Sequence, residues 1–139
     1  MRVKTEALVN LGRWDESLQT MGKVIEINPR NYDVIGRKGE LLDMMGRFNE
    51  SLQAFNQAIE LIPASDTSKL AETWLLKGDV LNKTGSHEEA LQAYDKAIEV
   101  NPIFGDAWRG RGEALKALGK VYDASMSFYM AQKLGYEEE

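Results

Sequence analysis

Small and bulky residues recur along this chain at nearly constant intervals, and this periodicity constrains the fold more than any other feature of the sequence. Four glycines are separated by 34, 39 and 34 residues, namely Gly12, Gly46, Gly85 and Gly119. The same intervals separate a column of small residues and a column of bulky ones: Ser17, Ser51, Ala90 and Ala124, and Met21, Phe55, Tyr94 and Phe128. Recurrence in fixed register indicates an array of one supersecondary unit rather than a fold built around one active-site cleft. We therefore expect function to lie on the surface that the array presents.

The clearest unit, residues 71–104, is predicted to be a helical hairpin. Trp74 and Leu81 fall on one stripe with the three- and four-residue spacings of an amphipathic helix. Gly85 is a natural left-handed stop for that helix, and Pro102 ends the second helix because proline cannot continue the hydrogen-bond ladder. A glycine within a helix costs about 1 kcal/mol relative to alanine. We therefore expect the helix glycines Gly39, Gly78 and Gly112 to pack closely against the column of small residues in the second helix, with the aromatic residue filling the wedge one turn on.

This pattern resembles the tetratricopeptide repeat (TPR), a helix–turn–helix module of about 34 residues. In the third unit the family's motif residues match Trp74, Gly78, Leu81, Gly85, Ala90, Tyr94, Ala97 and Pro102. The resemblance implies an all-α fold, a right-handed superhelix of tandem helix–turn–helix repeats (an α-solenoid), in a single TPR domain over residues 1–139. The expected repeats cover residues 1–31, where the first helix is truncated, and then 32–65, 71–104 and 105–138.

Two departures from a regular array stand out. Met1 occupies the tryptophan position of the first repeat, so either the array is part of a longer protein or its first helix is short. An insertion of five residues, 66–70, separates the second and third repeats. Because it is polar and lies just before a helix, we favour a lengthened helix start, capped by Ser65 or Asp66, over a loop that bulges toward the groove.

The composition argues against several classes of function. The formal net charge is −5 and the isoelectric point is near 5.0, which leaves no basic footprint for nucleic acid. Apolar runs are too short to span a membrane and no signal-peptide core follows the first residues, so a reducing, cytoplasmic setting is the default prediction. Cysteine is absent, no phosphate loop or HExxH motif occurs, and for the only histidine, His87, we expect a packing role. We therefore expect no catalytic residues, no metal site and no cofactor, and hence no enzyme.

In the TPR family the first helices line a concave groove that binds peptides or partner helices, so the resemblance places the function there. The first helices of this chain carry an acidic column that would favour a basic or amphipathic partner segment: Glu6, Glu40, Asp79 and Glu113. Basic residues three or four positions away leave the alternative of ordinary solvated ion pairs, each worth about 0.3–0.5 kcal/mol. The predicted groove residues are Glu6, Arg37, Glu40, Asp43, Met44, Asp79, Asn82, Lys83, Arg109, Glu113 and Lys116.

Some TPR proteins hold the C-terminal carboxylate of a chaperone with Lys, Asn and Arg side chains on successive first helices. Carried over to the complete repeats of this chain, those positions hold Gly36, Glu40, Leu76, Asp106 and Gly110. Counted from the first repeat, they hold Arg2, Glu6, Arg37, Glu72 and Leu76. Neither set forms a clamp, so binding of EEVD-type tails is disfavoured.

The last repeat differs where a following repeat would dock. The leucine and isoleucine of the earlier second helices become Ser125 and Gln132, which suggests a polar cap that ends the array. The same helix carries an apolar stripe at i, i+4 and i+7 that could serve self-association or a partner: Tyr122, Met126 and Tyr129. The alternative is that the tail folds over this stripe through Tyr136.

The repeat pattern and its resemblance together predict a protein–protein interaction scaffold that binds a protein or peptide segment in its groove, with no nucleic-acid or membrane partner. One alternative is a structural module that self-assembles into a homo-oligomer through the ends of the array. Another is a docking domain taken from a larger enzyme.

Overall fold

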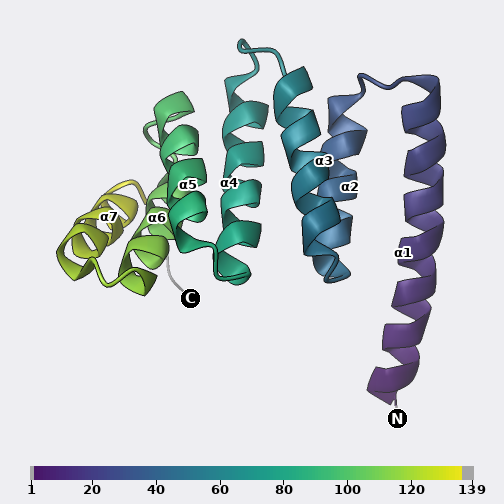
Figure 1. Ribbon diagram of the computed structural model, residues 1–139, viewed down its shortest axis with the longest axis horizontal. Helices are drawn as coiled ribbons and strands as arrows, with labels where there is room; N and C mark the ends of the chain where they lie inside the picture. The colour runs from purple at the N-terminus through teal and green to yellow at the C-terminus, as the bar shows by residue number, and fades with distance from the viewer. Residues whose placement is uncertain (1, 136–139) are drawn as a thin grey trace. The chain divides into compact units, whose positions relative to one another are not determined.

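The computed structural model describes residues 2–135, and the side chains of residues 12–135. The regular structure of this part of the chain is entirely helical and comprises seven helices (Figure 1). In chain order they are α1 (Arg2–Ile27), α2 (Tyr32–Met44), α3 (Phe48–Leu61), α4 (Thr67–Lys83), α5 (His87–Val100), α6 (Gly105–Ala117) and α7 (Val121–Lys133). The all-α fold predicted from the sequence is therefore confirmed.

The chain divides into two compact units, Met1–Leu61 and Ile62–Glu139, where the sequence led us to expect a single domain. The first unit holds α1, α2 and α3, and the second holds α4, α5, α6 and α7. Each unit has its own buried apolar residues, which include Ile35, Leu42 and Phe55 in the first and Val80, Leu81 and Tyr94 in the second.

Helices α2 and α3 form the hairpin of the first unit. The Asn31 side chain caps α2 by accepting a 3.3 Å hydrogen bond from the Val34 backbone N–H, and Gly46 turns the chain at a φ of +79°. Phe55 on α3 is buried against Gly39 on α2, where an added Cβ atom would lie 2.7 Å from the ring. The predicted close approach of Gly39 and the small residue Ser51 is confirmed, since the Ser51 hydroxyl donates a 2.6 Å hydrogen bond to the Gly39 carbonyl. The direct contact between the glycine and the aromatic ring, which was expected one turn away, is a finding of the structure.

Helix α1 runs without interruption through Gly12, so the prediction of a turn there is wrong. The expected hairpin of residues 1–31, with its truncated first helix, is replaced by one helix of 26 residues. The physical reason is a missing contact, because the first repeat has Thr5 and Met21 where the others have glycine and an aromatic residue. Without that contact a continuous helix keeps the hydrogen bonds that a turn would break, and its interior glycine costs only about 1 kcal/mol.

Helix α4 opens the regular structure of the second unit and takes up the insertion. It begins at Thr67, has 17 residues, and is capped by Asp66, whose side chain accepts a 3.3 Å hydrogen bond from the Lys69 backbone N–H. The corresponding helices α2 and α6 each have 13 residues. The insertion therefore lengthens the start of a helix, as predicted, rather than forming a loop.

Tyr94 lies at the centre of the second unit's core. It is fully buried on α5, and its ring lies between Gly78 on α4 and Gly110 on α6. A Cβ atom added at Gly78 would lie 2.8 Å from Cε1 of the ring, and one added at Gly110 would lie 2.5 Å from Cζ and closer still to Cε1. Gly112 on α6 makes the equivalent contact with Phe128 on α7. Glycine–aromatic contacts therefore hold both hairpins of this unit together.

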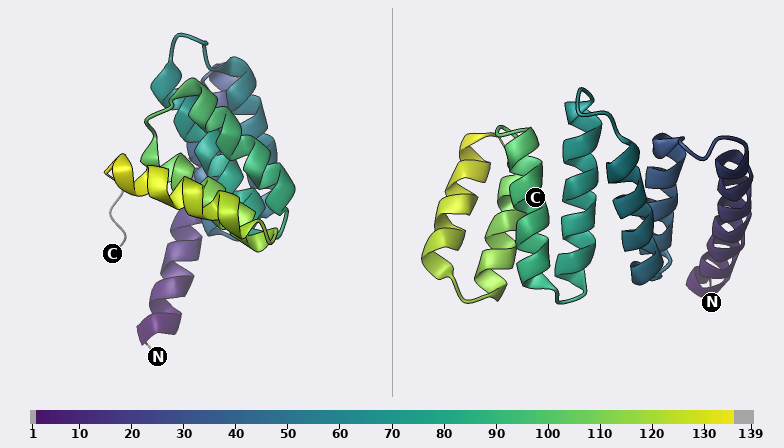
Figure 2. Two further views of the ribbon diagram at one scale, coloured as in Figure 1. Left: turned by 90° about the vertical axis from the view of Figure 1, so that its left-hand side faces the viewer. Right: turned by 45° about the horizontal axis from the view of Figure 1, so that its top comes forward.

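The second unit has two layers, with α4 and α6 in one and α5 and α7 in the other (Figure 1 and Figure 2). Helix α6 packs against both α4 and α5, whereas α5 and α7 make no contact with each other within the described residues. The first helices thus lie closer together than the second helices, so this unit curves with α4 and α6 on its inner side. The exposed surface of α4 and α6 is called the inner face below.

Candidate functional site

Four charged side chains gather on the inner face: Asp79 and Lys83 from α4, and Arg109 and Glu113 from α6. The Arg109 Nη2 atom lies 3.0 Å from Glu113 Oε1, in an i,i+4 ion pair within α6. Glu113, Lys83 and Arg109 all act electrostatically on the Asp79 carboxylate. The structure therefore brings together four of the residues predicted from the sequence, and this set is called the inner-face cluster.

Tyr94 reaches this cluster from the core. Its hydroxyl donates a 2.6 Å hydrogen bond to Asp79 Oδ1. Burial raises the pKa of the Tyr94 hydroxyl far above its ordinary value, and the negative charges of Asp79 and Glu113 add to the shift. The hydroxyl is therefore a permanent donor to Asp79 at any physiological pH.

The electrostatics of the cluster disfavour the charged form of Asp79. Loss of solvation raises the pKa of its carboxyl group and the neighbouring Glu113 raises it further, whereas the Tyr94 hydrogen bond, Lys83 and Arg109 oppose the shift. Asp79 as a whole residue is nevertheless exposed. A cation brought to this carboxylate would stabilise its charged form.

The basic residues Lys77 and Arg111 of the first helices are engaged by the fold. Each lies over the tryptophan three residues before it, with its charged end 5.0 Å and 5.8 Å from the respective ring centre. Arg111 Nε also donates to Asp95 Oδ1 on α5, and its Nη1 donates to Ser127 Oγ on α7, both at 2.7 Å. We therefore assign Arg111 to the packing of three helices and not to ligand binding.

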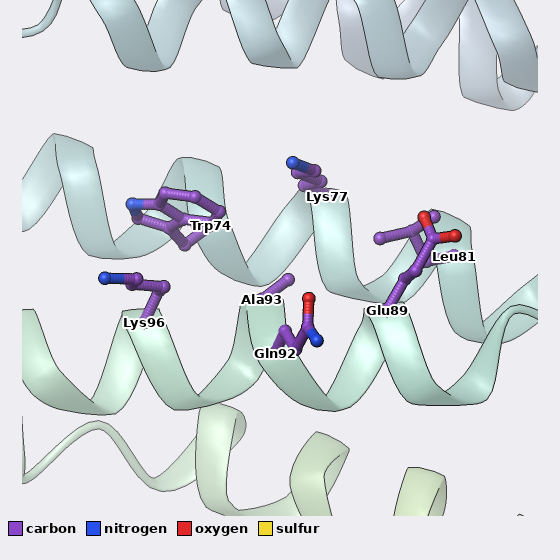
Figure 3. A pocket seen from close by; sticks show the side chains of 7 residues that line it. All are labelled: Trp74, Lys77, Leu81, Glu89, Gln92, Ala93 and Lys96. Carbon is purple, nitrogen blue, oxygen red and sulfur yellow. The ribbon is translucent and has the colours of Figure 1, made fainter.

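A separate cavity of about 260 Å³ lies along α4 and α5, lined by Trp74, Lys77, Leu81, Glu89, Gln92, Ala93 and Lys96 (Figure 3). Trp74, Leu81 and Ala93 give it an apolar part, and polar side chains surround them. Burial lowers the pKa of Lys77, and the charge of Glu89 partly opposes this shift. Because no predicted groove residue lines this cavity, it is distinct from the inner-face cluster.

Two further groove candidates of the second unit lie near the ends of their helices. Asn82 Oδ1 is 2.6 Å from His87 Nδ1, so its side chain is engaged at the turn between α4 and α5. Lys116 is exposed in the last turn of α6. His87 is half-buried beside Asn82, which agrees with the packing role predicted for it.

The groove candidates of the first unit lie on α2, except for Glu6, which lies in α1 outside the described side chains. Arg37 and Met44 are exposed, whereas Glu40 and Asp43 are half-buried. Met44 is the last residue of α2 and is 61 % exposed. The involvement of these residues in a groove stays a prediction.

The predicted apolar stripe is exposed on α7. Tyr122 is 78 % exposed, Met126 50 % and Tyr129 56 %. The Lys133 Nζ atom lies 5.9 Å from the centre of the Tyr129 ring. Tyr136, the residue expected to cover the stripe in the alternative prediction, lies outside the described residues.

Two contacts of the second unit had not been predicted from the sequence. Tyr94 was expected only to fill space, yet its hydroxyl binds Asp79. The sequence did contain one indication of this role. Phenylalanine occupies this column in the second and fourth repeats, so only the third repeat has a hydroxyl there. The bond from Arg111 to Ser127 was also missed, although a serine there replaces the alanine of the two preceding repeats.

The glycine–aromatic hairpins define the class of this protein as a tandem helical-hairpin repeat. A TPR repeat model matches residues 78–119, and a tetratricopeptide repeat model matches residues 32–65. The chain belongs to the tetratricopeptide repeat family. No curated protein matches the sequence.

Several solved structures share this fold. The structure titled "MamA RS-1 ArsTM double mutant" has a TM-score of 0.77 at 22 % identity, covering 92 % of this chain and 69 % of that one. MamA 41-end from Desulfovibrio magneticus RS-1 gives 0.77 at 22 % identity, covering 92 % and 70 %. The first TPR of Spaghetti (RPAP3), bound to the HSP90 peptide SRMEEVD, gives 0.69 at 17 % identity, covering 75 % and 79 %. At these identities the similarity is evidence of the fold alone.

The described part of the chain lacks two further features. Among the described side chains of residues 12–135, no group of three or more His, Cys, Asp or Glu residues is arranged to hold a metal ion. No helix in that part of the chain is both long enough and apolar enough to cross a bilayer.

Proposed function

We propose that this protein is an interaction scaffold whose inner face, on the second unit, binds a basic or amphipathic segment of a partner protein. Membership of the TPR family supports the general role. One observation carries the specific part: Asp79 is exposed on the inner face, and its pKa is raised despite the hydrogen bond from Tyr94. A partner's lysine or arginine would add to the positive charge that Lys83 and Arg109 already place beside this carboxylate.

The arrangement of the inner-face cluster favours one kind of segment. A cationic side chain at Asp79 would also benefit from the nearby negative charge of Glu113. Lys83 and Arg109 lie beside these carboxylates and would favour polar or acidic groups elsewhere on the same segment. We therefore propose an amphipathic segment with a central lysine or arginine, rather than an evenly basic one.

Two labelled probe peptides test this proposal by fluorescence anisotropy: an amphipathic peptide with central lysines and the same peptide with glutamate in their place. We expect the lysine peptide to bind more tightly and its affinity to fall as salt screens the charges. Asp79→Asn should weaken binding about fivefold, the effect of about 1 kcal/mol, while leaving an acceptor for Tyr94. Glu99→Gln is the matched control, because Glu99 is an exposed carboxylate on α5 that pairs with Lys96 at 3.6 Å.

Equal affinity for the two peptides would contradict the proposed preference for a basic segment. If Asp79→Asn binds the lysine peptide with unchanged affinity, Asp79 is not part of the binding site. A loss of affinity in the Glu99→Gln control would show that only the net charge matters.

We also propose that the scaffold acts without catalysis, cofactor or metal, in a reducing cytoplasmic compartment. The cysteine-free sequence suits such a compartment, because stability there cannot depend on disulfides. Measuring the protein's location with a fluorescent tag in its native host tests this part.

A further inference from the structure

Exposed apolar side chains of the second unit are concentrated on α7. Four large hydrophobic residues of this helix are exposed, which we call the α7 patch: Val121, Tyr122, Met126 and Tyr129. The other exposed large hydrophobic residue described in this unit, Ile103, stands alone before α6. Single exposed apolar residues are ordinary, but a contiguous patch marks an interaction surface.

The α7 patch is not the surface on which these repeats dock a following hairpin. On α5, which packs against α6, the docking positions hold Leu91 and Ile98, and both are half-buried. On α7 the equivalent positions hold Ser125 and Gln132, and both are exposed. The exposed apolar residues of α7 therefore lie on a side of the helix next to the docking side. This side would bind something other than a following repeat.

The charges at the two ends of α7 make this side self-complementary. Asp123 lies in the first turn and Lys133 in the last, and both are exposed. They are separated along the helix by about 15 Å, at 1.5 Å per residue. When two copies of α7 lie antiparallel, Asp123 of each copy comes beside Lys133 of the other, with the rings of Tyr122 and Tyr129 along the seam. A two-fold interface requires this kind of self-complementarity.

We propose that the α7 patch is a self-association surface, on which a second copy of the chain docks with the two α7 helices antiparallel. Asp123 of each copy pairs with Lys133 of the other, and the apolar residues of the α7 patch are buried. The inference is independent of the proposed peptide site, because α7 contributes no residue to the inner-face cluster.

The size of the patch limits the strength of the dimer. An aromatic side chain buries 150–250 Å², so the exposed fractions of the four residues amount to roughly 450 Å² in each copy. Stable interfaces bury about 800 Å² in each partner. We therefore expect a reversible dimer with a dissociation constant of about 10 µM to 1 mM.

Sedimentation velocity over a series from about 1 µM to 1 mM protein, spanning the expected affinity range, tests the proposal on the full chain. We expect a monomer at the low end and a dimer at the high end. Tyr122→Glu should weaken the dimer at least tenfold. Ile103→Glu makes a similar apolar-to-acidic change at a site 73 % exposed but off the patch, and should leave the dimer unchanged. Circular dichroism should show that both variants keep their helices.

A charge exchange tests the antiparallel arrangement. Asp123→Lys and Lys133→Asp should each weaken the dimer severalfold, and the double variant should restore it, because both members of each pair change sign. An effect on the helix dipole alone predicts the reverse, with the double variant weakest. A monomer at every concentration, a dimer that survives Tyr122→Glu, an unrestored double variant or open-ended oligomers would each overturn the proposal.

Discussion

The packing of Tyr94 between two helices can be tested by adding one methyl group at Gly110. In Gly110→Ala the new Cβ atom would lie 2.5 Å from Tyr94 Cζ, where ordinary contacts are 3.4–4 Å. The ring cannot move away, because Gly78 contacts it from α4 and Asp79 holds its hydroxyl at 2.6 Å. Helix α6 must therefore shift away from α5.

The expected magnitude is the difference between two opposing effects. Overpacking a well-filled core costs about 1–3 kcal/mol, whereas alanine gains up to about 1 kcal/mol over glycine in a helix. We expect Gly110→Ala to lower the free energy of unfolding by about 1–2 kcal/mol. Gly36→Ala on α2 is the matched control, because no atom lies within 4 Å of its added Cβ and only the helix-forming gain should appear.

Urea denaturation followed by tryptophan fluorescence measures both variants, with Trp108 on α6 as a reporter close to Gly110. A double-mutant cycle with Tyr94→Leu adds a second check, since removing the ring should turn Gly110→Ala from destabilising to stabilising. The reasoning is refuted if Gly110→Ala stabilises the protein as Gly36→Ala does. It is also refuted if the cycle shows no coupling between the two positions.

Three further predictions concern the second unit. The raised pKa of Asp79 means that the folded state binds the proton of this carboxyl group more tightly than the unfolded chain does. The resulting stabilisation of the fold is fully present below the unfolded pKa of 3.8 and is lost as pH rises through the folded pKa. Asp79→Asn should therefore flatten that part of the profile of unfolding free energy against pH. Asp66→Ala removes the cap of α4 and should cost about 1 kcal/mol, seen as faster hydrogen exchange in the first turn of that helix. Arg111→Lys should cost about 1–2 kcal/mol in urea denaturation, because lysine cannot hold Asp95 and Ser127 with one planar fork; Lys96→Arg, on the exposed side of α5, is its control.

The hairpins of the second, third and fourth repeats were predictable because the information for each is local. Gly46, Gly85 and Gly119 all adopt a positive φ, between +79° and +89°, as a glycine that stops a helix should. The glycine and the aromatic residue whose contact closes each hairpin are likewise separated by the same number of residues in each repeat. Gly12 has the same place in the column, yet α1 passes through it. A glycine that can stop a helix produces a turn only when the two flanking helices gain a packing contact by folding back on each other. The residues that make this contact lie elsewhere in the repeat, so the glycine alone does not predict the turn.

The candidate site was predictable in position but not in electrostatics. Helical spacing alone predicted that Asp79 and Glu113 lie on corresponding faces of successive first helices, and they act on each other in the structure. The ion pair between Arg109 and Glu113, found at 3.0 Å, was one of the alternatives that the sequence offered. The sequence could not show that Asp79 loses solvation beside Tyr94. These differences depend on which atoms surround each carboxylate, and that depends on how closely three helices approach.

Tyr94 connects the repeat pattern to the part of the surface that is particular to this chain. Its ring does what phenylalanine does in the second and fourth repeats, packing against glycines so that the hairpins close. Its hydroxyl, which phenylalanine lacks, donates a hydrogen bond from the core to Asp79 on the inner face. The same reasoning applies on α7, where apolar residues replace the polar ones of earlier repeats on a side not used for packing. In a repeat protein the columns that match explain why the chain folds, so the positions that depart from them are the ones from which function should be argued.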